Sequence, residues 1–490
     1  MSIVNHRALT DIAPGSKIYF IGIAGISMCG LAEISVHLSY NVAGSDPRSS
    51  LQVLNLRNLG VQVNSEQIAE NIDSFDPELV VYTSAIPATN PERVRAMELG
   101  IQTVSRAEYL GWITRSYKTV INIAGTHGKT TTTAMASMIL IESGANPTVH
   151  LGADLDDFNS STVHLGSSNN LLVSEACEYK NSLLNFYSTT AAILNIDEDH
   201  MDFFTDIDDI IHTFVRFGAD LPEEGNLVIP SHSRHIGTFM DRLRETCLEE
   251  KHTLPNIVTF GAFTEDSAIQ PTFYYKNLRY EDGFPRFSVY YNDELYRHIK
   301  LAVPGEHNVH NALAAIACAH LNGGTPEAAH KVLATFRGAG GRFTKVGTYK
   351  GASVIADYAH HPTEIAATLQ AADQIPHRKI WPVCQILNYT RAKDLYESFI
   401  DVFKNREEVI FYKIYSSRES DNLGMSAECF VEDINSRGRL AHAANSLAEI
   451  HALLDNRVTE EDIILFLGPE DIREVSQHFC QSEHGVYLHH

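Results

Sequence analysis

Apolar strand patterns that lead through a turn into a helical pattern recur three times along the chain. They occupy residues 17–38, 118–144 and 351–372. Further apolar runs with the length of strands lie at 171–174, 191–196, 379–385, 408–412 and 462–467. Strands that are apolar throughout and alternate with helices are typical of parallel sheets with helices on both faces. The pattern therefore predicts an α/β protein with mostly parallel sheets.

A different pattern fills residues 262–300, where aromatic and β-branched residues alternate around turn signals such as Glu281-Asp282-Gly283. This alternation predicts an antiparallel insertion. At 490 residues the chain is too long for one ordinary core. A polar break precedes the second strand–turn–helix stretch, and a glycine cluster precedes the third. We expect three domains, at 1–116, 117–336 and 337–490.

Composition narrows the classes of partner. The chain has 38 basic and 61 acidic side chains and a formal charge of −23. A surface of that sign repels nucleic acids and anionic membranes, so we expect neither as a partner. No run reaches the roughly 18 apolar residues of a membrane span, and the N-terminus lacks an apolar signal segment, so we expect a cytoplasmic protein without membrane insertion. The seven scattered cysteines contain no C-x-x-C pair, which argues against a disulfide framework.

The stretch NIAGTHGKTTTTAM, residues 122–135, has the Gly-Lys-Thr ending of a phosphate-binding loop. Only two residues separate Gly125 from Gly128, where the common loop has four. Backbone N–H groups at such a turn and at the start of the following helix attract anions. Lys129 supplies a positive charge and Thr130 a hydroxyl for Mg²⁺. The predicted nucleotide-binding residues are Gly125, Thr126, His127, Gly128, Lys129, Thr130 and Thr131; the alternative is a glycine turn before an ordinary helix.

Mg²⁺ prefers oxygen ligands and usually takes a carboxylate. Glu175 follows the apolar run 171–174, and Asp199 and His200 follow the run 191–196. Because the carboxyl ends of parallel strands share one edge of a sheet, these side chains are expected to converge on the phosphate loop. Each is a weak signal alone, and their joint occurrence favours a metal site.

Several separate motifs fall in the order of one known family. They are EACEY at 175–179, NIDEDHMD at 195–202, PGEHNVHNALAAIA at 304–317, GRF at 341–343 and DYAHHPTEI at 357–365. With these motifs the chain resembles the Mur ligase family, the ATP-dependent amide-forming enzymes of peptidoglycan precursor synthesis. The family's phosphate loop has the form G-T-x-G-K-[ST], which matches the short spacing seen here. The resemblance covers nearly the whole chain.

The resemblance implies a fold and a reaction. The fold would have Rossmann-like N- and C-terminal domains and a central P-loop ATPase domain. The reaction would join a small amino acid, with L-alanine expected, to the lactyl carboxylate of UDP-N-acetylmuramate through an acyl phosphate. ATP and Mg²⁺ would be required, with Mn²⁺ as an alternative ion. Such an enzyme serves cell-wall growth, cell shape and division, and the resemblance leaves a monomer or a dimer open.

The resemblance also implies roles for individual residues. Lys129, Glu175 and His200 would be catalytic, and Thr130, Glu175 and His200 would bind Mg²⁺. The remaining ATP contacts would come from His307, Asn308, Asn311, Arg342 and Asp357. The first domain would bind the UDP-sugar through Gly22, Ala24, Gly25, Ile26, Ser27, Met28, Ser45, Asp46, Ser84 and Ala85. The third domain would contribute Tyr358, His360, His361, Tyr389 and Arg391 to substrate binding.

One segment departs from the family pattern and keeps alternatives open. Leu387 and Asn388 stand where the family usually has a His and an Arg. A related ligase that uses another amino acid or a recycled peptide is one alternative. A nucleotide- and UDP-sugar-binding protein without ligase activity is another. An NAD-dependent dehydrogenase, suggested by a glycine loop followed by Asp46, would leave Lys129 and Glu175 unexplained.

Overall fold

The computed structural model describes residues 12–48, 50–265, 271–416, 419, 421–469 and 471–481. Contacts between residues divide the chain into two compact units. Unit 1 comprises Met1–Ile196, Ile210–Thr259 and Ala314–Thr325. Unit 2 comprises Asp197–Asp209, Phe260–Leu313 and Pro326–His490.

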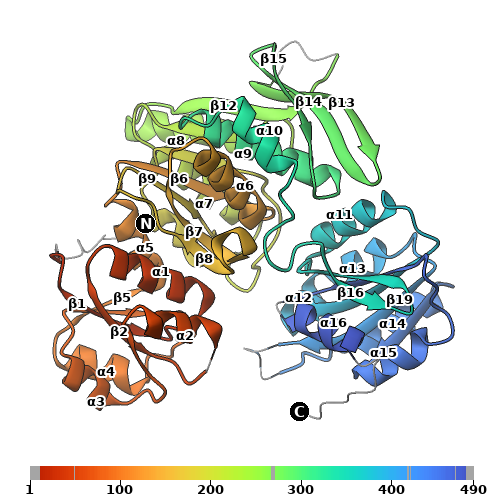
Figure 1. Cartoon of the computed structure of the whole chain (residues 1–490), viewed down its shortest axis with the longest axis horizontal. Helices are drawn as coiled ribbons and strands as arrows, with labels where there is room; N and C mark the ends of the chain where they lie inside the picture. Colours follow the sequence, from red (N-terminus) through yellow and green to blue (C-terminus); the bar gives the residue numbers. More distant parts are fainter. Residues whose placement is uncertain are drawn as a thin grey trace. The chain divides into compact units, whose positions relative to one another are not determined.

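Unit 1 begins with a parallel five-stranded sheet of order β3-β2-β1-β4-β5. Its strands are β1 (Lys17–Ile21), β2 (Asn41–Ser45), β3 (Gln62–Asn64), β4 (Leu79–Tyr82) and β5 (Gln102–Ser105). Its helices are α1 (Ile26–His37), α2 (Leu51–Asn58), α3 (Ala69–Phe75), α4 (Pro91–Glu98) and α5 (Arg106–Thr114) (Figure 1). Neighbouring residues of β1 face opposite sides, since Tyr19 contacts Phe75 of α3 and Phe20 contacts Tyr109 of α5. Both faces of this sheet are therefore covered, as the apolar strand predicts.

The second sheet of unit 1 contains the phosphate loop. This sheet has ten strands, and the seven that lie wholly or mainly in unit 1 run in the order β12-β11-β10-β6-β9-β7-β8. The strands are β6 (Thr119–Ala124), β7 (Thr148–Leu155), β8 (Ser161–His164), β9 (Leu171–Glu175), β10 (Thr190–Ile193), β11 (Asn226–Pro230) and β12 (Asn256–Ala262). The helices are α6 (Lys129–Glu142), α7 (Ile207–Ala219), α8 (Ile236–Glu250) and α9 (Glu306–His320), with short 3₁₀ turns η1 (Asp156–Phe158) and η2 (Tyr179–Asn185). The first residues of α7, to Asp209, and those of α9, to Leu313, belong to unit 2. The pairs β6–β9, β6–β10, β7–β9 and β10–β11 are parallel, and the antiparallel pair β7–β8 was not among the predicted strands.

Unit 2 contains the antiparallel strands predicted within residues 262–300. They are β13 (Phe273–Glu281), β14 (Phe284–Tyr291) and β15 (Glu294–Lys300). The β13–β14 hairpin turns at Asp282 and Gly283, whose φ angles of 52° and 86° are both left-handed. A tight two-residue hairpin requires that geometry, which Asp-Gly adopts readily. Residues 266–270 of this predicted insertion lie outside the described residues.

A six-stranded sheet of order β16-β17-β21-β18-β19-β20 forms the rest of unit 2. Its strands are β16 (Thr344–Tyr349), β17 (Ala352–Asp357), β18 (Ile380–Leu387), β19 (Glu408–Tyr415), β20 (Leu440–Ala444) and β21 (Ile463–Leu467), and only β16 is antiparallel to its neighbour. Its helices are α11 (Pro362–Asp373), α12 (Tyr389–Asp394), α13 (Tyr396–Val402), α14 (Ala427–Ser436), α15 (Leu447–Leu454) and α16 (Asp471–Gln481), whereas α10 (Pro326–Leu333) contacts β15. Val354 and Ile355 belong to separate apolar clusters, one on each face of the sheet.

These three sheets confirm the predicted α/β class with mostly parallel strands (Figure 1). Within the part of the chain that the structure describes, no helix has the length and apolar character needed to cross a membrane.

Candidate functional site

The phosphate loop joins β6 to α6 through two glycines in left-handed conformations. Gly125 has a φ of 131° and Gly128 a φ of 83°. A Cβ atom on Gly125 would lie 2.9 Å from the backbone nitrogen of Leu194, too close for any side chain. Gly128 is the N-cap of α6, so the loop ends at the amino end of that helix. This geometry explains the two glycines and gives the arrangement of N–H groups that favours a bound anion.

Asn195 holds the shape of this loop. Its side-chain oxygen accepts the His127 N–H at 2.8 Å, and its side-chain nitrogen donates to the His127 carbonyl at 3.0 Å. The N–H of Thr126 donates to the Asn195 carbonyl at 3.3 Å. Sequence reasoning did not single out Asn195, although it is the first residue of the NIDEDHMD motif. Thr126 and His127, in the middle of the loop, are thus hydrogen-bonded to the segment that follows β10.

Lys129 forms an ion pair that the sequence analysis did not predict. Its Nζ lies 3.1 Å from Glu178 Oε2, and it donates to the carbonyls of Gly125 and Thr126 at 2.6 and 3.0 Å. The side chain of Lys129 is 16% exposed and that of Glu178 only 2%. Glu178 belongs to the EACEY motif, so the sequence contained a feature that could have identified it. The pair places a fixed, largely buried ammonium group at the loop.

Thr130 and Glu175 meet as predicted. The Thr130 hydroxyl donates to Glu175 Oε2 at 3.0 Å, and the N–H of Gly152 donates to Glu175 Oε1 at 2.5 Å. A hydroxyl beside a carboxylate is a donor set that suits Mg²⁺. A Cβ on Gly152 would lie 2.8 Å from the Glu175 carboxylate, so a side chain there would displace that carboxylate. His200, the third predicted ligand, lies in unit 2, and its part in this site stays a prediction.

The predicted UDP-sugar loop of the first sheet is also held in a defined shape. Gly22 has a φ of 83°, and its N–H donates to the Ser45 carbonyl at 2.8 Å. The N–H of Ala24 donates to Asp46 Oδ2 at 3.1 Å. A Cβ on Gly22 would approach Thr83 to 2.7 Å, which places the turn after β4 against this loop. The remaining predicted residues here follow this loop at the start of α1 (Gly25, Ile26, Ser27, Met28) or lie exposed in the facing turn (Ser84, Ala85).

In unit 2, Arg391 pairs with Asp199, an acid that the sequence analysis placed near the metal site. Arg391 Nη2 lies 2.6 Å from Asp199 Oδ1, and both side chains are largely buried. Burial opposes ionisation of Asp199, but the charges of His200, Arg391 and His360 hold the pKa of that carboxyl well below its usual range. Burial in turn lowers the pKa of His360 to about 4. Tyr389 is fixed by its N–H, which donates to Glu419 Oε2 at 2.5 Å.

The other ATP-side residues of unit 2 lie on α9 and at the start of the C-terminal sheet. On α9, Asn311 donates to the side-chain oxygen of Asn308 at 3.1 Å; both side chains are buried, whereas His307 is exposed. Asp357 accepts the N–H groups of residues 343 and 359, each at 2.7 Å, and burial raises the pKa of its carboxyl. The Arg342 guanidinium stacks 4.2 Å from the ring centre of the predicted substrate residue Tyr358. His361 is buried and caps α11 by accepting the N–H of residue 363.

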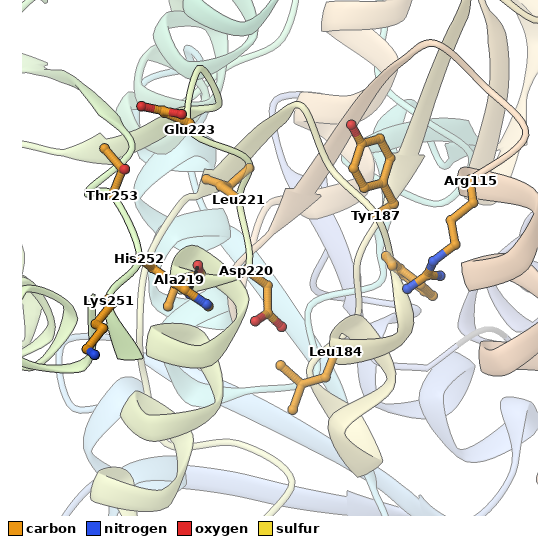
Figure 2. A pocket seen from close by; sticks show the side chains of 11 residues that line it. Arg115, Leu184, Tyr187, Ala219, Asp220, Leu221, Glu223, Lys251, His252 and Thr253 are labelled. Atoms are coloured by element: carbon orange, nitrogen blue, oxygen red, sulfur yellow. Dashed lines mark hydrogen bonds between the residues drawn. The ribbon is translucent and has the colours of Figure 1, made fainter. Parts of the chain in front are cut away.

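A cavity of about 530 Å³ in unit 1 lies apart from this chemistry (Figure 2). Its lining residues come just before strands β6, β10, β11 and β12, whereas the phosphate loop follows β6. The cavity therefore lies at the amino ends of the parallel strands, on the edge opposite the loop. None of the predicted site residues lines it. The lining residues are Arg115, Leu184, Phe186, Tyr187, Ala219, Asp220, Leu221, Glu223, Lys251, His252 and Thr253.

Comparison with known proteins identifies the family. A protein of Lachnospira eligens named UDP-N-acetylmuramate–L-alanine ligase is 41% identical over 461 residues, which cover 94% of this chain and 97% of that protein. The chain belongs to the Mur ligase family. Three Mur ligase models match in order: the family's catalytic domain at residues 17–118, the middle domain at 123–319 and the glutamate ligase domain at 341–469.

Solved Mur ligase structures agree with this fold. A UDP-N-acetylmuramate–alanine ligase from Thermotoga maritima is 27% identical, covers 96% of this chain and 99% of its own, and superposes with a TM-score of 0.76. A murein peptide ligase from Psychrobacter arcticus shares the fold at 22% identity, with coverage of 97% and 100% and a TM-score of 0.68. The resemblance drawn from the motifs and the three-domain α/β fold are thereby confirmed.

Proposed function

We propose that this Mur ligase joins L-alanine to the lactyl carboxylate of UDP-N-acetylmuramate, with ATP as the energy source. The observation that carries the proposal is the 41% identity, over nearly the full length of both chains, to a protein named for that reaction. The loop geometry supports it, because Lys129 offers a positive charge at the phosphate loop and Thr130 and Glu175 form a hydroxyl–carboxylate pair of the kind that Mg²⁺ prefers. We place the reaction in peptidoglycan precursor synthesis in the cytoplasm.

The residues of this chain divide the work of the reaction. The loop around Gly125 and Gly128 and the amino end of α6 bind the ATP phosphates through N–H groups. Lys129 places its positive charge where negative charge accumulates as the γ-phosphoryl group moves to a carboxylate oxygen. Thr130 and Glu175 would hold Mg²⁺, with His200 as the third proposed ligand, and the ion would supply positive charge that offsets the phosphate charge. The transfer yields an acyl phosphate on the sugar.

The second half-reaction forms the amide. The free amine of the amino acid attacks the acyl carbon, the C–O bond to the phosphate breaks, and inorganic phosphate leaves. Arg391 and Tyr389 stand beside Leu387 and Asn388, in the segment where the family receives the amino acid. Leu387 and Asn388 differ from the family pattern, so the identity of the amino acid is the part of the proposal that most needs an experiment.

Phosphate release tests the proposal directly. The protein is incubated with Mg-ATP and UDP-N-acetylmuramate, and each of the twenty amino acids is added in turn. We expect release that requires the nucleotide sugar and that L-alanine stimulates more than any other amino acid. Stimulation by a different amino acid, or only by a muropeptide-derived peptide, would identify the related ligase instead. No stimulated release with any of them would overturn the ligase assignment.

A further inference from the structure

Arg106 is a charged residue for which neither the motifs nor the mechanism provides a role. It is the first residue of α5, and its Nη1 donates to the Ser27 hydroxyl at 3.1 Å. Among the described residues, this is the only hydrogen bond of its guanidinium, which has no ion pair. Burial lowers the pKa of Arg106, an effect that the nearby Cys177 and Glu175 partly offset. Arg106 is therefore a partly buried cation with most of its donors unused.

The guanidinium is linked to both predicted binding loops of unit 1. It donates to Ser27, in the UDP-sugar loop at the start of α1, and Ser27 in turn contacts His150 of β7. Gly152 of the same strand donates to Glu175, which meets Thr130 at the phosphate loop and whose charge acts on Arg106. A substrate whose sugar end reaches toward the ATP phosphates must cross this region.

The surroundings fix Arg106 and Ser27 in place. The Ser27 hydroxyl also lies 3.1 Å from His150 Nε2, and the same nitrogen lies 3.2 Å from the Ser27 carbonyl. His150 is buried in β7. A Cβ on Gly30 of α1 would lie 2.7 Å from Val163, so α1 packs directly on the β7–β8 pair. A rigid frame of this kind suits a residue that must hold a ligand in one position.

We infer that Arg106 binds an oxyanion of the nucleotide-sugar substrate. A guanidinium offers five donors in a planar fork that matches phosphate and carboxylate oxygens. A cation removed from water gains most from a bound anion when no counter-ion of the chain already pairs with it. The oxyanion is either the diphosphate or the lactyl carboxylate of the sugar, which share this chemistry. The inference rests on the proposed function, because it takes the UDP-sugar as the ligand.

Binding measured by calorimetry tests the inference without turnover. The proteins are the wild type, Arg106→Ala, Arg106→Lys, Ser27→Ala and, as a matched control, Arg115→Ala at the other end of α5. The ligands are UDP-N-acetylmuramate, UDP-N-acetylglucosamine, which lacks the lactyl carboxylate, and a non-hydrolysable ATP analogue with Mg²⁺. We expect Arg106→Ala to weaken UDP-N-acetylmuramate binding by about 10- to 100-fold, as the loss of a charge-assisted hydrogen bond predicts.

The change in affinity for each ligand shows which oxyanion Arg106 binds. Equal losses for both UDP-sugars assign Arg106 to the diphosphate, and a loss confined to UDP-N-acetylmuramate assigns it to the carboxylate. Arg106→Lys should lose less than Arg106→Ala, and the ATP analogue and Arg115→Ala should show wild-type affinity. Unchanged sugar affinity in Arg106→Ala would overturn the inference. So would an Arg106→Ala change that costs no further affinity in a Ser27→Ala background, because Arg106 would then only position Ser27. If the wild type itself binds neither UDP-sugar, the proposed function fails instead.

Discussion

Replacing Lys129 by alanine should have two separable effects, one on catalysis and one on stability. Removal of the ammonium group takes away the charge that meets the transferring phosphoryl group, and turnover should fall by about 10³-fold. The change also leaves Glu178, which is 2% exposed, without the partner that lies 3.1 Å away. Removal of one partner of a buried ion pair costs about 3 kcal/mol of folding free energy. The midpoint temperature of the first unfolding transition should therefore decrease by about 6–12 °C.

The double variant Lys129→Met/Glu178→Gln separates the two effects. With both charges removed, no uncompensated carboxylate remains, and the unfolding temperature should return to within about 3 °C of the wild type. Turnover should stay as low as in the single variant, because the phosphate-binding charge is still missing. UDP-sugar affinity should be close to the wild-type value in both variants.

The assays are phosphate release with saturating substrates, thermal unfolding followed by circular dichroism, and calorimetric UDP-sugar binding. The reasoning about the pair is refuted if Lys129→Ala unfolds at the wild-type temperature. The reasoning about catalysis is refuted if the double variant turns over at more than about a tenth of the wild-type rate. Loss of UDP-sugar binding in both variants would mean that the two loops have been assigned to the wrong ligands.

Four further outcomes are expected. Gly152→Ala crowds the Glu175 carboxylate and should raise the Mg²⁺ concentration for half-maximal activity about tenfold. An unchanged Mg²⁺ dependence would contradict the assignment of Glu175 as a metal ligand. Chelation of divalent ions should abolish phosphate release, and Mn²⁺ should restore it in part. Arg391→Met takes the guanidinium partner from the largely buried Asp199 and leaves only the weaker contacts with His200, so denaturant unfolding should show a loss of about 3 kcal/mol that Asp199→Asn in the same chain largely removes. Burial holds the pKa of His150 at about 4, below its usual 6.5, so the unfolded chain binds more protons between these values and His150 should make stability rise with pH from 4 to 6.5, by up to about 3 kcal/mol. His360 adds a rise of the same sign, so His150→Gln should reduce the slope without removing it, and an unaltered profile would contradict the reasoning.

Most of the architecture could be predicted because local patterns determine it. The strand–turn–helix stretches became β1–α1, β6–α6 and β17–α11, and the Asp282-Gly283 turn became a hairpin. The β7–β8 pair escaped prediction because β8 has only four residues and both strands mix polar with apolar residues. Pairing with β9 rather than periodicity creates that ribbon.

The site was predictable where a short sequence motif is by itself typical of one kind of chemistry, as the Gly-Lys-Thr ending with Lys129 and Thr130 is of phosphate binding. Glu178 and Asn195 were missed although they lie inside quoted motifs. Their roles depend on long-range contacts, 49 and 68 residues away in sequence, which no local pattern specifies. Arg106 is the extreme case, since its partner Ser27 is 79 residues distant.

The most direct test of the central claim follows oxygen from the carboxylate into phosphate. UDP-N-acetylmuramate labelled with ¹⁸O in both lactyl carboxylate oxygens is turned over with ATP and L-alanine in unlabelled water. An acyl phosphate route transfers one labelled oxygen to each phosphate released and leaves the other in the amide carbonyl. Mass spectrometry should therefore find one ¹⁸O in every phosphate formed. Unlabelled phosphate accompanied by amide formation would contradict the account, because ATP would then have been cleaved without activating the carboxylate through phosphoryl transfer.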